Sequence, residues 1–563
     1  MMKWLRLPAV SVVAGVFLWA SFAPLHLWPM SIVGIACLVA EIRRRGFGGS
    51  LACGFITGAV FFGLLCDWAA GAAGTWIARV GLGGVLALYT AVLALVWKAV
   101  ILAWGESWKS VPILAVTWVA IEDFQGKWPE GGMPWGKLAF GQVEGPIVHL
   151  APYGSTELVS FAVVVLGAGL AYAVRSAKLT PRSSVIGVAC ACLTLVAVAA
   201  IPLGSRYGES LKVGFVQGNV SRDKKLTGYA RALTVTERLA IQTRKIENKH
   251  AELVLWPESS SDLDPQEVDE TRELIEGAVS RLDVPLLLGI QRYPEDYRYN
   301  EYTMWLPGKG QVSRYTKQHP VPFGEYIPAR GFFRFFTKAV DQVSTDMRPG
   351  NGPAILDVPV RGRTVRVAAP ICFEIAYTEI VSESVRKGAR IIAVPTNNAS
   401  FGDSAESRQQ FDMTRFRAIE TGRTAIQIST MGVSGIADAD GTVRETTDMW
   451  TADSRVADVD LHSHLTPAVR WEIWINRVSG LTAVALGVLA LCKTLRKAPH
   501  SPRRLKVRNC NNAASKSGEA VRNETARKHS KTTCSEAVAA TAKQPVAKKA
   551  RSNDERRRDH TDL

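Results

Sequence analysis

The pattern of apolar and polar residues divides the chain into three parts. Residues 1–203 are dominated by long apolar runs, residues 204–476 alternate short apolar runs with amphipathic stretches, and residues 496–563 are polar and basic. A membrane-spanning helix needs about 20 mostly apolar residues. The apolar runs therefore predict eight spans, at about 8–24, 28–41, 50–70, 81–104, 110–124, 154–174, 184–203 and 477–495.

Basic residues in the short loops predict the direction of these spans, because loops rich in Lys and Arg stay in the cytoplasm. They fall before the first span and after the second, fourth, sixth and eighth, which places them all on one side: Lys3 and Arg6, Arg43 to Arg45, Lys109, Arg175, Lys178 and Arg182, and the tail. We therefore expect a multi-pass protein of the cytoplasmic membrane with residues 204–476 on the extracytoplasmic side. Residues 126–152, rich in Gly, Pro and Trp, favour an interfacial or re-entrant position against protein.

The middle part carries the signature of an α/β domain. Runs typical of buried strands occur at 212–220, 252–258, 284–292, 365–374, 389–398 and 424–431. Helical stretches separate several of them, at 228–248, 265–282 and 407–422. Alternating strands and helices indicate an α/β domain, in which functional residues usually follow strand ends.

Charge and cysteine content refine this picture. Residues 495–563 hold 18 Lys or Arg and 7 Asp or Glu, so +11 of the net +16 charge lies in the tail. Such a tail is typical of disordered, solvated chain that can touch anionic lipid, and no folded nucleic-acid module accompanies it. Only Cys372 among the nine cysteines lies within 204–476, so it is either a packing residue or a reactive thiol.

Three residues at predicted strand ends have complementary chemistry. Glu258 ends the second strand, Lys317 precedes a turn-rich segment, and Cys372 ends the run at 365–374. A carboxylate can accept the proton of a thiol and an ammonium can stabilise an oxyanion, so the set suits acyl transfer through a thioester. Taken singly, each also has an ordinary reading: a capping Glu, a solvated Lys and a buried packing Cys.

The segments around these residues are more specific than the residues themselves. WPES with Glu258, YTKQHPVPFGEYIP with Lys317 and ICFE with Cys372 resemble the three signature segments of the nitrilase superfamily. The resemblance implies a Glu-Lys-Cys triad on an αββα sandwich. Seven spans before this domain and one after it resemble the apolipoprotein N-acyltransferase family, over residues 1–495. GGMPWGKLAFGQ, QGNV and the segment from TNNASFG to FRAIETGR also match it.

The resemblance assigns roles to individual residues. It implies that Glu258 is the general base and acid, that Lys317 stabilises the oxyanion and that Cys372 is the nucleophile. It further implies supporting carboxylates at Glu325 and Glu374. The residues that follow Cys372 and the strand at 389–398 add two candidates: the backbone N–H of Phe373 as an oxyanion donor, and Asn398, beside Asn397, as an orienting residue or an ordinary turn residue.

The resemblance also implies the reaction. The acyl donor is a phospholipid, the acceptor is the α-amino group of a diacylated apolipoprotein, and no cofactor or metal is required. We expect a monomer that contacts the bilayer and binds no nucleic acid. Two alternatives stay open: a membrane-tethered nitrilase-type amidase acting on a small amide, and a non-enzymatic transporter or receptor carrying a degenerate domain.

Some positions outside the triad are ambiguous or depart from the family pattern. His319 is either catalytic or a turn-stabilising residue, and the Phe-rich segment 331–340 is either a lid that dips into lipid or a core helix. Phe373 replaces a frequent Tyr, Ser400 replaces an expected Trp, and Leu226 stands near another expected Trp. The last three positions bear on acyl-chain or headgroup preference, because they line the substrate approach in the family.

Overall fold

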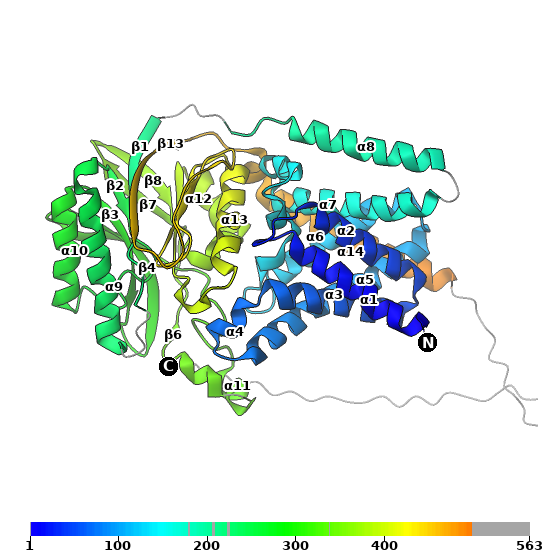
Figure 1. Cartoon of the computed structure of the whole chain (residues 1–563), viewed down its shortest axis with the longest axis horizontal. Coiled ribbons are helices and arrows are strands. Elements are labelled where there is room, and N and C mark those ends of the chain that lie inside the picture. Colours follow the sequence, from blue (N-terminus) through cyan, green and yellow to red (C-terminus); the bar gives the residue numbers. More distant parts are fainter. Residues whose placement is uncertain (1, 178–180, 205–208, 222–225, 337, 498–563) are drawn as a thin grey trace, which may run out of the picture. The chain divides into compact units, whose positions relative to one another are not determined.

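A computed structural model describes residues 2–177, 181–204, 209–221, 226–336 and 338–497. The predicted tail from residue 498 onward therefore lies outside the described residues. The described chain has a helical part, built from α1–α8 and α14, and an α/β part that we call the sandwich (Figure 1).

The helical part contains a helix at each of the eight predicted spans, together with the short helix α4. Its helices are α1 (Met2–Ala20), α2 (Pro29–Arg44), α3 (Phe47–Leu65), α4 (Trp68–Ala72), α5 (Trp76–Trp104), α6 (Val111–Gln125), α7 (Ala151–Ser176), α8 (Pro181–Ala199) and α14 (Pro467–Lys497). Within the described residues, four helical segments are long and apolar enough to cross a membrane: Phe47–Leu65, Trp76–Trp104, Pro146–Ser176 and Pro467–Thr494. The last helix begins at Pro467, earlier than the predicted 477.

The connection between α6 and α7 is a chain of short 3-10 turns. These turns are η2 (Pro134–Gly136), η3 (Leu138–Gln142) and η4 (Pro146–Leu150), and most of their residues are buried. Because Gly and Pro interrupt regular α-helix, the polar backbone here is satisfied by local turns and neighbouring protein. The segment is thus held against protein, as predicted, and its interfacial or re-entrant position in the membrane stays a prediction.

The sandwich consists of two stacked sheets. The first has the order β13-β1-β2-β3-β4-β5, with β6 paired to β4, and the second has the order β12-β11-β10-β9-β8-β7. Its strands are β1 (Glu209–Gln217), β2 (Leu253–Leu255), β3 (Leu286–Arg292), β4 (Tyr297–Leu306), β5 (Gly310–Thr316), β6 (Asp346–Met347), β7 (Ile355–Val360), β8 (Arg363–Ala368), β9 (Ile391–Thr396), β10 (Ala425–Ser429), β11 (Gly435–Ala437), β12 (Val443–Thr446) and β13 (Asp453–Leu461).

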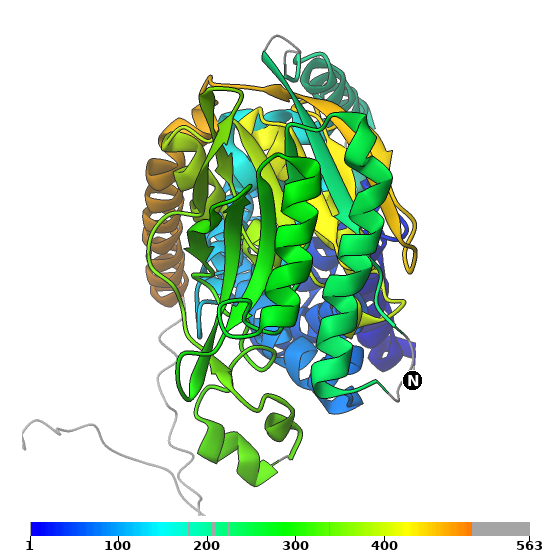
Figure 2. The ribbon, with the colours of Figure 1, turned by 90° about the vertical axis from the view of Figure 1, so that its left-hand side faces the viewer.

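Helices cover both outer faces of the sheet pair. Helices α9 (Gly228–Thr243) and α10 (Asp269–Leu282) lie on the first sheet, where they stand in front in Figure 2. Helices α12 (Thr378–Arg386) and α13 (Glu406–Thr421) lie on the second sheet, on the side of the helical part (Figure 1). This is the predicted αββα arrangement.

Several predicted boundaries differ from the structure. Strands β4 and β5 form an antiparallel hairpin that the apolar pattern did not predict, because its residues are mostly Tyr, Thr and other polar or charged types and include no long apolar run. The run at 365–374 was predicted as one strand, but β8 ends at Ala368. Pro370, two residues later, has no backbone N–H to donate to a neighbouring strand, so the strand cannot continue regularly through it. Cys372 instead begins the 3-10 turn η7 (Cys372–Ala376).

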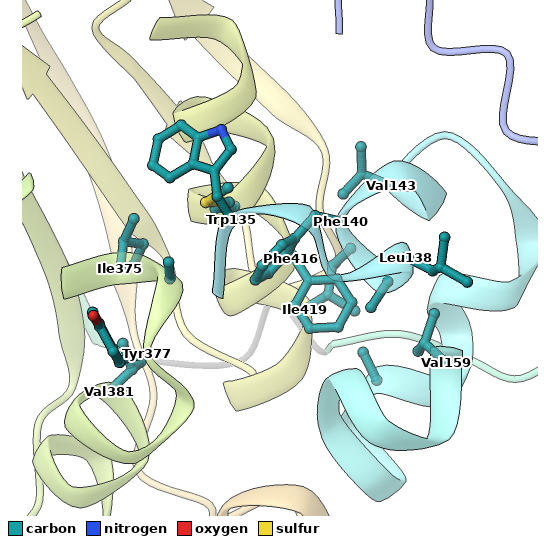
Figure 3. Packing of buried hydrophobic residues seen from close by; sticks show 14 of the residues in the cluster. Trp135, Leu138, Phe140, Val143, Val159, Ile375, Tyr377, Val381, Phe416 and Ile419 are labelled. Atoms are coloured by element: carbon teal, nitrogen blue, oxygen red, sulfur yellow. The ribbon is translucent and has the colours of Figure 1, made fainter. Parts of the chain in front are cut away.

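Helix α13 is buried on two sides, since it packs both on the second sheet and on the helical part. Phe140 of η3 meets Phe416 edge to face, with their ring centroids 5.4 Å apart (Figure 3). Leu138, Val159 and Ile419 lie beside them in the same apolar cluster. A single hydrophobic core therefore runs from the helical part into the sandwich.

Candidate active site

The Glu258 carboxylate lies just after β2, among buried hydrogen-bond donors. It is 4% exposed. Asn300 Nδ2 donates to Oε1 at 2.6 Å, and the backbone N–H of Asn397 donates to Oε2 at 2.8 Å. Lys317 Nζ lies 3.3 Å from Oε1. These contacts come from β4, from the residue after β9 and from the residue after β5, so the two sheets together position one carboxylate.

Lys317 is a buried cation between two carboxylates. Its side chain is 1% exposed, and its Nζ donates to Glu325 Oε1 at 2.7 Å as well as to Glu258. Glu325 Oε2 accepts the backbone N–H of Val321 at 2.7 Å, which ties this carboxylate to the turn after Lys317. Burial opposes the charge of Lys317, but the two carboxylates outweigh burial and raise the pKa of its ammonium group.

Cys372 stands at the first position of η7 with a backbone φ of +54°. Non-glycine residues seldom occupy this left-handed region, and such strain is often found at functional sites. The residue is 8% exposed. Burial, followed by the charge of Glu258, raises the pKa of the thiol, while Lys317 acts in the opposite sense. The sulfur is therefore a protonated thiol at neutral pH and needs a base to become a nucleophile.

Glu374 holds the Cys372 turn and the Lys317 turn together. Its carboxylate accepts the backbone N–H groups of Ile371 at 2.8 Å and Gln318 at 2.7 Å, and the Tyr315 hydroxyl at 3.0 Å. Burial raises the pKa of Glu374 to about 7, although Lys317 and the backbone donors act against this rise. Glu374 thus joins the turn that begins at Cys372 to the turn that follows Lys317 through hydrogen bonds.

Phe373 contacts the helical part directly. Its ring stacks on Trp135 of η2, with the ring centroids 5.4 Å apart and the planes only 4° from parallel. Trp135 Nε1 donates to Gln409 Oε1 on α13 at 2.8 Å, and Gln409 Nε2 donates to the carbonyl of Leu65 at 3.2 Å. The wall beside Cys372 is therefore built partly by the segment between α6 and α7.

Asn398 lies inside a buried network and does not act as a simple turn residue. Its Nδ2 donates to Glu406 Oε2 at 2.8 Å and to Gln410 Oε1 at 2.9 Å. Its Oδ1 accepts the hydroxyls of Ser429 at 2.6 Å and Ser407 at 3.2 Å. Burial raises the pKa of Glu406 to about 8. Asn397 contributes its backbone N–H to Glu258 and also accepts the Thr430 hydroxyl through its side chain.

The remaining predicted positions are also placed by the structure. His319 stacks on Tyr377 with the ring centroids 4.5 Å apart, which favours the turn-stabilising role. Phe332 and Phe335 of α11 (Arg330–Phe336) are 62% and 85% exposed, which contradicts the core-helix alternative. Ser400 is exposed and Leu226 is half-buried. In the described ranges, no group of three His, Cys, Asp or Glu side chains is arranged to hold a metal ion.

The structure adds four residues that the sequence analysis missed. Asn300 contacts Glu258, Thr396 and Gln410 contact the sulfur of Cys372, and Trp135 covers the turn beside it. Trp135 belongs to the segment GGMPWGKLAFGQ, which resembles the family. Because it is more than 200 residues from Cys372 in the sequence, its contact with the turn at Cys372 could not be predicted. Together the site offers a buried base, a buried cation and a thiol, which is the set that acyl transfer through a thioester requires.

Comparison with known proteins agrees with this geometry. The model of the apolipoprotein N-acyltransferase N-terminal domain matches residues 14–169, and that of the carbon-nitrogen hydrolases matches residues 212–464. An apolipoprotein N-acyltransferase of Mycolicibacterium smegmatis is 30% identical over 534 residues, covering 88% of this chain and 87% of the relative. The chain belongs to the apolipoprotein N-acyltransferase family. The resemblance seen in the sequence is thereby confirmed, for the helical part and for the sandwich.

Other relatives cover a similar span. An apolipoprotein N-acyltransferase of Azotobacter vinelandii is 29% identical and covers 89% of this chain and 99% of its own. Among solved structures, a mutant of the Nesterenkonia AN1 amidase from the nitrilase superfamily aligns with 49% of this chain and 100% of its own, at 16% identity and a TM-score of 0.36. The N-acyltransferase relatives match both parts of the chain.

Proposed function

We propose that the protein transfers an acyl chain from a phospholipid to the α-amino group of the diacylglyceryl-cysteine at the amino terminus of apolipoproteins. The observation that carries this proposal is the buried cluster of Glu258, Lys317 and Cys372, walled on one side by Trp135 of the helical part. Membership of the N-acyltransferase family supports the same reaction. A catalytic site joined to membrane-spanning helices suits two substrates that both reside in lipid.

The first half-reaction forms a thioester. Glu258 removes the proton of the Cys372 thiol, and the sulfur attacks the ester carbonyl of the phospholipid. Lys317 Nζ and the backbone N–H of Phe373 stabilise the negative charge on the carbonyl oxygen. As the C–O bond breaks, Glu258 returns the proton to the departing oxygen. The products are the acyl-enzyme and a lysophospholipid.

The second half-reaction transfers the acyl group to nitrogen. An α-amino group has a pKa of about 7.7–8.0, so a useful fraction is neutral near pH 7. The neutral amine attacks the thioester carbonyl, and Glu258 takes the proton that the nitrogen loses. The C–S bond breaks, the sulfur recovers a proton from Glu258, and an amide leaves the site. Exclusion of water by the buried wall protects the thioester from hydrolysis.

The proposal includes a position in the membrane. Basic residues at Arg43 to Arg45 and at Arg175 support a cytoplasmic side opposite to the sandwich, which is then extracytoplasmic. Residues 1–203 and 477–495 form the membrane domain in this view, 204–476 the catalytic domain and 496–563 a cytoplasmic tail. The exposed rings of Phe332 and Phe335 suit contact with lipid at the bilayer surface. We propose a monomer that needs no cofactor.

The experiment uses the full chain in detergent, a phospholipid labelled in its sn-1 acyl chain and a diacylated lipopeptide with a free amino terminus. We expect label on the lipopeptide with the wild type and with Cys192→Ala, which removes an exposed cysteine outside the site. We expect none with Cys372→Ala. Wild type that transfers no label, yet releases ammonia from small amides, would replace the proposal with the tethered amidase.

A further inference from the structure

Two polar side chains touch the sulfur of Cys372 from the second sheet and from α13. Thr396, the last residue of β9, places Oγ1 3.3 Å from Sγ, and Gln410 places Nε2 3.5 Å from it. Both side chains are fully buried. The contacts are within hydrogen-bonding range for sulfur, which accepts more strongly as a thiolate than as a thiol.

Thr396 has more partners than its single proton can serve. Its Oγ1 lies 2.7 Å from the carbonyl oxygen of the Gln410 side chain and 3.3 Å from Sγ. A hydroxyl carries one proton and two lone pairs. While sulfur is a thiol, the Thr396 hydroxyl can donate to Gln410 and accept from the S–H group; Asn398 Nδ2 also donates to it, at 3.3 Å. Once sulfur is ionised, a rotation about the Cβ–Oγ1 bond turns the same proton toward it.

The surrounding network fixes which end of the Gln410 amide faces sulfur. Its carbonyl oxygen receives Thr396 Oγ1 and Asn398 Nδ2, the latter at 2.9 Å, so its NH2 group points to Sγ. Asn398 is oriented in turn by Glu406 and Ser429. Because Asn398 still donates to the Gln410 carbonyl when the Thr396 proton rotates away, that oxygen keeps a partner in both states.

We propose that Thr396 and Gln410 are catalytic groups that stabilise the Cys372 thiolate by hydrogen bonds made to its sulfur. This inference rests on the proposed function, in which Cys372 is the nucleophile. The charged groups that face the sulfur are Glu258, Lys317 and Glu406. Lys317 is the cation of this set, and burial favours the neutral form of Glu406, so the two neutral donors add to the stabilisation that Lys317 gives the thiolate.

The test measures the ionisation of the thiol directly. Full-length protein in detergent is treated with iodoacetamide across a pH series, and mass spectrometry follows modification of the peptide containing Cys372. Thr396→Val removes the hydroxyl at nearly constant shape, and Gln410→Met removes the amide. Thr396→Ser restores the hydroxyl. The matched control is Thr414→Val, which removes a buried hydroxyl of α13 bonded to Gln427 Oε1 at 3.0 Å.

We expect Thr396→Val and Gln410→Met to move the midpoint of the alkylation profile upward by about one pH unit. We expect Thr396→Ser and Thr414→Val to keep the wild-type midpoint. Acyl-enzyme formation by Thr396→Val should fall about tenfold at neutral pH and recover as the pH rises. An unchanged midpoint in Thr396→Val, or an equal shift in Thr414→Val, would overturn the inference. Wild type that shows the expected profile but transfers no acyl group would instead refute the proposed function.

Discussion

Arg417 links the turn after Cys372 to the helical part through buried contacts. Its Nε donates to the carbonyl of Ile375 at 2.9 Å, its Nη2 to that of Ala376 at 2.8 Å, and its Nη1 to Glu420 Oε2 at 2.6 Å. Neither Arg417 nor Glu420 is exposed to solvent. Glu420 also accepts a hydrogen bond from Ser155 Oγ, at the kink of α7.

Replacing Arg417 with Met should destabilise the fold strongly. The carbonyls of Ile375 and Ala376 lose their hydrogen-bond donor. The buried carboxylate of Glu420 loses its ion pair and keeps the hydrogen bond from the Ser155 hydroxyl. Breaking a buried ion pair by removing one partner costs about 3–5 kcal/mol. Replacing the whole pair with apolar residues is often neutral, so Arg417→Met with Glu420→Met should cost only the hydrogen bonds lost by the carbonyls of Ile375 and Ala376 and by the Ser155 hydroxyl, about 3 kcal/mol in sum.

The order of stability tests this reasoning. The full-length variants would be heated in one detergent, and the midpoint for loss of folded, monodisperse protein would be recorded. We expect the wild type to be the most stable, the double variant to be intermediate and Arg417→Met to be the least stable. An Arg417→Met variant as stable as the wild type, or a double variant less stable than Arg417→Met, would refute the account of this pair.

Three further predictions concern the site and its surroundings. Lys317→Met should slow acyl-enzyme formation by about 10²–10³-fold in rapid-quench assays, because it removes a positioned oxyanion donor; a wild-type rate would contradict that role. Burial raises the pKa of Glu374 to about 7 from an ordinary value of 4.5. The folded state then binds this proton more tightly, so the group favours folding below pH 4.5 and loses that effect as the pH rises through about 7. Glu374→Gln should accordingly show a flatter profile of thermal stability than the wild type between these values, and identical profiles would argue against it. Phe335→Ser should reduce transfer from donors in vesicles more than from donors dispersed in detergent, and an equal effect on both would exclude a role at the lipid surface.

The positions of Glu258 and Cys372 could be predicted because they follow buried strand runs and lie in recognisable segments. Their companions could not. Asn300 lies outside the recognisable segments, and Thr396 and Gln410 lie inside one that gave no sign of their contact with the sulfur; the three meet only because β4, β9 and α13 converge on one site. Such convergence depends on sheet order, which local patterns do not contain.

In the fold, too, some features could be predicted from local sequence and others depend on tertiary contacts. The structure has a helix at each long apolar run, and four of the described helical segments are long and apolar enough to cross a membrane. The last helix, α14, begins at Pro467 rather than at 477, and it contacts α12 and α13. The β4–β5 hairpin was missed because it contains no long apolar run; Tyr, Thr and charged residues make up much of it, and cross-strand pairing stabilises them there. Tertiary contacts, rather than local composition, decided both cases.

The most direct test of the central claim locates the covalent intermediate. Wild-type protein would be incubated with phospholipid alone, digested and examined by mass spectrometry. The account predicts one acyl chain on the peptide containing Cys372, removed by hydroxylamine and lost when the diacylated lipopeptide is added. An acyl chain on another residue, or efficient transfer to the lipopeptide without any acyl-enzyme on Cys372, would contradict it.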